Sequence, residues 1–82
     1  QLDEGVQQLL LLFQQALTLN PDGIDPNYFH GDFLLRQKRY GEARAALQKA
    51  LAAPDRPGRE VADAGRRDEA RALLAKVKEK LE

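Results

Sequence analysis

The sequence predicts an all-α fold on the strength of two observations. Apolar residues recur at steps of three and four along most of the chain, and no segment shows the alternation of apolar and polar residues that is typical of a strand. Clusters of proline and glycine divide the chain into segments of helical length. Four helices are therefore expected, near residues 3–19, 26–37, 40–53 and 60–80. At 82 residues the chain has the length of one domain, 1–82, with a thin core.

The first helix is predicted from an apolar stripe that ends at the turn sequence Asn20-Pro21-Asp22-Gly23. Leu11 and Leu12 fall off this stripe, so the helix is apolar around most of its circumference and is expected to pack on a second side. Sequence upstream of Gln1 would supply that contact, as would a homodimer formed through Leu11 and Leu12. The residues of the stripe are Val6, Leu9, Leu10, Phe13, Ala16 and Leu17.

Capping residues set the expected starts of the later helices. Asp25 is predicted to be the N-cap of the second helix, with Pro26 at its first position, where a missing N–H costs nothing. The segment from Pro54 to Gly58 is predicted to be a turn, because it holds two prolines and a glycine. The last helix begins either near Arg59, running through a glycine, or after a cap at Asp63, and the longer form is favoured.

The residue inventory argues against an enzyme. The chain has no serine and no cysteine, and its single threonine, Thr18, falls inside the first predicted helix. His30 is the only histidine and has no carboxylate or second ligand on its helical face, so a half-buried structural imidazole is expected. The aspartates around the first turn lack the glycine and glutamate of a calcium loop. No catalytic residue, metal site or cofactor is therefore predicted.

Charge is unevenly distributed along a chain whose net charge is zero. Residues 1–35 hold five acidic and no basic side chains, whereas residues 36–82 hold thirteen basic and eight acidic ones. The net charge of zero argues against nucleic-acid binding, because such proteins usually carry an excess of basic residues. No apolar run is long enough for a membrane span. A cytoplasmic and, with a signal peptide upstream, a periplasmic location both stay open.

An internal repeat links two of the predicted helices. The segment Gln14-Gln15-Ala16-Leu17 realigns with Gln48-Lys49-Ala50-Leu51 at an offset of 34 residues. The chain resembles the tetratricopeptide repeat family and looks like part of a bacterial-type member. It departs from the family pattern at His30, where leucine is usual, and at Asn27, where a large aromatic residue is frequent. The matching residues are Tyr28, Gly31, Gln37, Tyr40, Glu42, Ala43, Leu47, Ala50 and Leu51.

The resemblance implies antiparallel helix pairs stacked as a short right-handed superhelix with a C-terminal capping helix. Residues 1–22 would be the second helix of a preceding repeat, 24–55 a complete repeat, and 59–82 the cap. Gly31 and Ala43 would face each other across the helix pair.

The implied function is that of a protein–protein interaction scaffold without catalysis, which binds a peptide or a partner subunit in a groove. The residues expected to bind the partner are Tyr28, Asp32, Leu35 and Arg36. Tyr28 and Leu35 could instead pack on the last helix. The alternative function is structural self-association within a longer protein.

Overall fold

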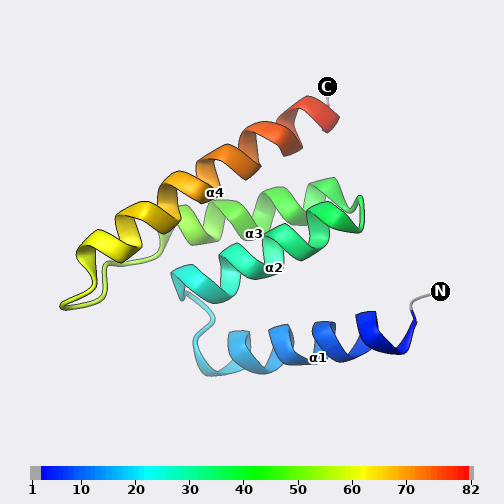
Figure 1. Cartoon of the computed structure of the whole chain (residues 1–82), viewed down its shortest axis with the longest axis horizontal. Helices are drawn as coiled ribbons and strands as arrows, with labels where there is room; N and C mark the ends of the chain where they lie inside the picture. The colour runs from blue at the N-terminus through cyan, green and yellow to red at the C-terminus, as the bar shows by residue number, and fades with distance from the viewer. Residues whose placement is uncertain (1–2, 82) are drawn as a thin grey trace.

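A computed structural model describes residues 3–81, and this part of the chain consists of four helices without a strand. The helices are α1 (Glu4–Leu19), α2 (Ile24–Arg36), α3 (Tyr40–Ala52) and α4 (Glu60–Leu81). The all-α prediction is confirmed. The helices follow one another in chain order, with α1 and α4 at the two edges (Figure 1). The Cα atoms extend over 41 × 31 × 14 Å, so the helices form a thin slab.

The start of α2 differs from the prediction. Gly23 occupies the N-cap, and Asp25 and Pro26 are the second and third residues of the helix. Proline is tolerated there because the first four N–H groups of a helix have no acceptor within it. The side-chain amide of Asn27 donates to the carbonyl oxygens of Pro21 at 3.0 Å and Gly23 at 2.8 Å, which ties the preceding turn to the helix. Asn27 thus has a buried structural role.

The other helix starts are close to those predicted. Asp3 caps α1 by accepting a hydrogen bond from the N–H of Val6 at 2.8 Å. The longer form of α4 is confirmed, since this helix begins at Glu60 and continues through Gly65. Asp63 is therefore a residue of the first turn of α4 and not its N-cap.

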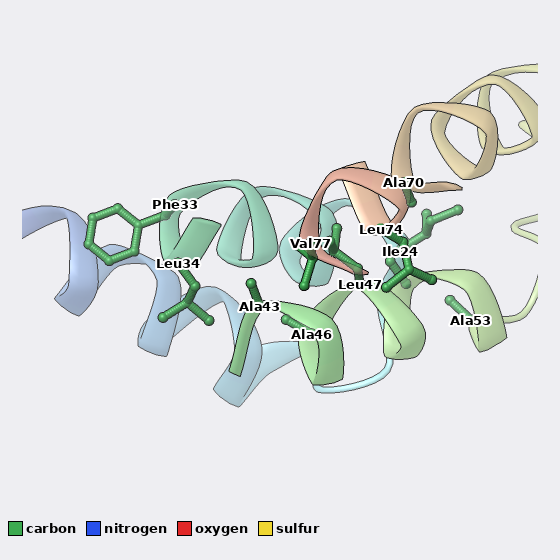
Figure 2. Close-up of a cluster of buried hydrophobic side chains, with 11 residues drawn as sticks. Ile24, Phe33, Leu34, Ala43, Ala46, Leu47, Ala53, Ala70, Leu74 and Val77 are labelled. Atoms are coloured by element: carbon green, nitrogen blue, oxygen red, sulfur yellow. The ribbon is translucent and has the colours of Figure 1, made fainter. Parts of the chain in front are cut away.

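The core lies between α2, α3 and α4 (Figure 2). Small residues let these helices approach closely: Ala43, Ala50 and Ala70 have no exposed surface. Gly31 approaches Leu47 most closely, because a Cβ atom at Gly31 would lie 2.7 Å from the Cγ and Cδ2 atoms of Leu47. The buried apolar residues are Ile24, Phe33, Leu34, Ala43, Ala46, Leu47, Ala50, Ala53, Ala70, Leu74 and Val77.

In contrast, α1 has no buried residue. Val6, Leu10 and Phe13 pack against the edge of the core, whereas Leu9, which belongs to the predicted apolar stripe, is 47% exposed. The reason is that α1 contacts α2 alone among the described helices, so only a narrow strip of its surface is covered. Leu9 lies just beside that strip.

Replacement of Gly31 by valine is expected to destabilise the fold by about 1–3 kcal/mol, because the added carbons would overpack Leu47 in a site without free space. The matched control is Gly65→Ala. Nothing lies within 4 Å of a Cβ atom at Gly65, so that substitution should stabilise α4 by about 1 kcal/mol. Urea unfolding of both variants measures the two effects. Equal stability of Gly31→Val and the parent would show that the α2–α3 contact is wrong.

Candidate functional site

A hollow of about 270 Å³ opens between α1 and α2 and is the candidate functional site. We call it the α1–α2 hollow. Its floor and walls are mainly apolar, with one ion pair at the rim: the Nε atom of Arg36 lies 3.3 Å from a carboxylate oxygen of Asp32. The residues that line it are Leu9, Phe13, Phe29, Asp32, Phe33 and Arg36.

Helical spacing explains why these side chains meet. Phe29, Phe33 and Arg36 are separated by steps of four and three residues, so they share one face of α2. Phe13 of α1 packs against Phe33, with ring centroids 5.3 Å apart, and so closes the bottom of the hollow. Leu9 and Phe29 remain 47% and 43% exposed. Two large apolar side chains are therefore available to a partner at the mouth of the hollow.

The structure divides the four residues predicted to bind a partner. Asp32 and Arg36 line the α1–α2 hollow, and Arg36 is the more exposed of the two. Tyr28 is half-buried and its hydroxyl donates to Glu69 of α4 at 3.4 Å, while Leu35 is half-buried against the core. Tyr28 and Leu35 thus contribute mainly to packing within the chain.

Arg66 of α4 packs against Phe29 outside the hollow. Its guanidinium carbon lies 4.7 Å from the ring centroid of Phe29 and 4.8 Å from that of Tyr28, which are cation–π distances. Its Nε atom also donates to Asp25 at 3.1 Å. Arg66 therefore holds the two aromatic rings against α4 and limits the freedom of Phe29.

A buried carboxylate fixes the start of α4, and with it the place of Arg66. Asp63 has no exposed surface and accepts hydrogen bonds from the backbone N–H of Arg56 and from its Nε atom, each at 2.9 Å, and a further one from its Nη2 atom. These hydrogen bonds lower the pKa of Asp63 to about 2. Arg56 also lies 3.6 Å from Asp25 at the start of α2. The network joins the α3–α4 turn to α2 and α4.

A second hollow, of about 340 Å³, is bordered by α1, α2 and α3 around His30. The imidazole is half-buried, and its ring centroid lies 5.9 Å from that of Phe13. Burial lowers the pKa of His30, because it disfavours the imidazolium. A half-buried imidazole beside the ring of Phe13 is consistent with the structural role predicted for it.

Residues 3–81 hold neither a cluster of metal-ligating side chains nor a membrane-spanning helix. Within this range no three acidic, histidine or cysteine side chains gather where they could hold a metal ion. No helix in the same range is both long and apolar enough to cross a membrane. The hydroxyl of Thr18 donates to the carbonyl of Gln14 at 2.8 Å.

Comparisons of the chain with protein-family models, with curated proteins and with solved structures find no match. The tetratricopeptide resemblance therefore stays a prediction from the residues.

The sequence pointed to Asp32 and Arg36 but missed the apolar part of the hollow. Phe29 lies one position from Tyr28, and the repeat pattern singles out Tyr28. The missed signal is the pair Phe29 and Phe33, whose spacing of four places two aromatic residues on one face of α2. Phe13 on the apolar stripe of α1 could have marked where that face is met.

The pKa of Asp63 predicts a loss of stability in acid. Folding lowers this pKa from 3.8 to about 2, so the carboxylate stabilises the folded state above about pH 4 and loses this effect as the pH falls towards 2. The melting temperature measured by circular dichroism should fall across that window. Asp63→Asn should melt lower than the parent at neutral pH and show a flatter profile in acid.

The control is Asp68→Asn, which removes an exposed carboxylate paired with Arg71 at 2.8 Å. This variant should keep the acid profile of the parent. An unchanged acid profile in Asp63→Asn would mean that Asp63 is not the group responsible.

Proposed function

We propose that the chain is a protein-interaction scaffold of tetratricopeptide type, which binds a segment of a partner protein at the α1–α2 hollow and carries out no reaction. The proposal includes the stacking of the helices as part of a right-handed superhelix. The single observation that carries it is the pair of exposed apolar side chains, Leu9 and Phe29, on either side of a hollow with an ion pair at its rim. Apolar contact ringed by polar groups is the usual anatomy of a binding interface.

The size and lining of the hollow indicate what binds. A volume of about 270 Å³ suits one or two apolar side chains and is small for a cofactor. Phe13 and Phe33 at the floor favour a branched aliphatic or aromatic anchor residue. Arg36 can form a bidentate contact with a carboxylate, and Asp32 can accept hydrogen bonds from backbone N–H groups. The proposed ligand is a peptide segment with one apolar anchor and an acidic neighbour.

Self-association is the second candidate function. The observation that favours it is the exposure of Leu11 and Leu12, which are 53% and 59% exposed on the side of α1 away from the core. Clustered exposed leucines on a small domain often mark a site of protein contact. This surface differs from the α1–α2 hollow, so the two functions do not compete for the same residues.

Peptides selected on the parent chain from a random display library test the scaffold function. Binding of the selected peptides should fall at least about tenfold when Phe29 and Arg36 are both replaced by alanine, because about 1.4 kcal/mol of lost contact corresponds to that factor. Titrations followed by NMR should shift the amide signals of Leu9 and Phe33. The proposal fails if the double variant binds these peptides as tightly as the parent.

The matched control is Arg71→Ala together with Val61→Ala on α4. Arg71 is exposed in a pair with Asp68, and Val61 is 89% exposed, so this variant loses the same kinds of group far from the hollow. Its affinity for the selected peptides should equal that of the parent. Melting curves of both variants show whether either substitution disturbs the fold.

A further inference from the structure

One side of α1 is apolar, uncharged and exposed, and we call it the outer face of α1: Gln8, Leu11, Leu12, Gln15 and Leu19. The three leucines are 53%, 59% and 87% exposed. A shallow hollow of about 410 Å³ lies on this side of the helix and is lined by residues of α1 only. The outer face therefore offers both projecting side chains and room to receive others.

The body of α1 beyond its first turn carries no charge, which sets this helix apart from α4. No ionisable side chain occurs between Gly5 and Pro21, whereas eleven of the 22 residues of α4 are charged. A helix surface that faces water usually carries charges, as α4 does. A strongly charged partner would find no opposite charge along the body of α1 and would have to desolvate its own groups there.

The residue types of the outer face are those that pair well with themselves. A contact between two identical surfaces related by a two-fold axis is self-complementary, so its residues meet copies of one another. Leucine packs against leucine, and the amide of glutamine carries both donors and an acceptor, so that two glutamines can satisfy each other. No like charges would be buried along the helix.

From these observations we infer that the outer face of α1 binds the outer face of α1 in a second copy of this chain, with the two helices antiparallel. This inference rests on self-association, the second candidate function. The middle of α1 falls between Leu11 and Leu12. A two-fold axis at that point brings these leucines of the two copies together and places Gln8 opposite Gln15 of the second copy.

The antiparallel direction follows from the ends of the helix. Asp3 and Glu4 lie at the N-terminus of α1. Parallel helices would bring the acidic ends of both copies together and align their macrodipoles, which is unfavourable. Antiparallel helices keep these ends apart and set each N-terminus beside the C-terminus of the other helix. One helix from each copy makes a small interface, so we expect a weak, concentration-dependent dimer.

Sedimentation of the full chain tests whether the dimer forms. The mean mass should rise from that of one chain to that of two as the concentration increases from about 1 µM to about 1 mM. Leu11→Glu with Leu12→Glu should stay at the mass of one chain, while Val61→Glu on α4, also an exposed apolar residue, should behave like the parent. A parent that remains one chain at the highest concentration, with α1 helical by NMR, overturns both the dimer and the self-association function.

Disulfide crosslinking tests the geometry, since the chain has no cysteine of its own. Gln8→Cys and Gln15→Cys are made in separate chains and mixed under oxidising conditions. The mixed disulfide should dominate, because an antiparallel pair sets equal positions seven residues apart along the axis, about 10 Å, which is beyond the reach of a disulfide. Dominance of Gln8→Cys paired with itself would overturn the antiparallel arrangement and leave self-association standing.

Discussion

The close approach of α2 and α3 at Gly31 is the contact on which the rest of the structure depends. Leu47 fills the space that a side chain at Gly31 would need, and both residues are buried. Alanines on α3 then allow α4 to settle against the same pair of helices through Ala70 and Val77. Because the core is built from these three helices, α1 is left to pack along one strip of α2. The exposure of its other sides follows from that arrangement.

The candidate site depends on a second, electrostatic constraint. Asp63 has no exposed surface at the start of α4, and the hydrogen bonds from Arg56 take the place of the water that would otherwise solvate its carboxylate. That contact sets where α4 begins relative to the start of α2. Arg66 follows three residues later on the same helix and reaches Asp25 and the ring of Phe29. Phe29, which lines the α1–α2 hollow, is thus held by Arg66, and the place of Arg66 depends on the contact between Arg56 and Asp63 outside the hollow.

Periodicity and turn residues predicted all four helices, because local sequence dominates where proline and glycine interrupt an apolar repeat. The predicted start of α2 was wrong by two residues. The side chain of Asn27 ties the preceding turn to the helix by donating to Pro21 and Gly23, and a capping pattern does not reveal such contacts. The role of Asp63 was missed for a similar reason. Its partner Arg56 is seven residues away across a turn, and only the folded chain brings the two together.

For the candidate site, too, the contacts within one helix could be predicted from the sequence and the contacts between helices could not. Asp32 and Arg36 could be found because they lie four residues apart on one helix, and such pairs follow from helical geometry alone. The contributions of Leu9 and Phe13 depend on the angle at which α1 meets α2, which no local pattern records. The apolar stripe shows that Leu9 shares a face with Phe13, but it does not show how wide a strip of α1 is covered by α2.

The width of that strip also explains how two surfaces of different chemistry can exist on one short helix. Phe13 faces α2 at the floor of the hollow, Leu9 lies at its edge, and Leu12 points away from the core. Leu9 and Leu12 are three residues apart on α1, so the edge of the hollow adjoins the outer face. The charged rim suits a partner with charges of its own, whereas the uncharged outer face suits one without them.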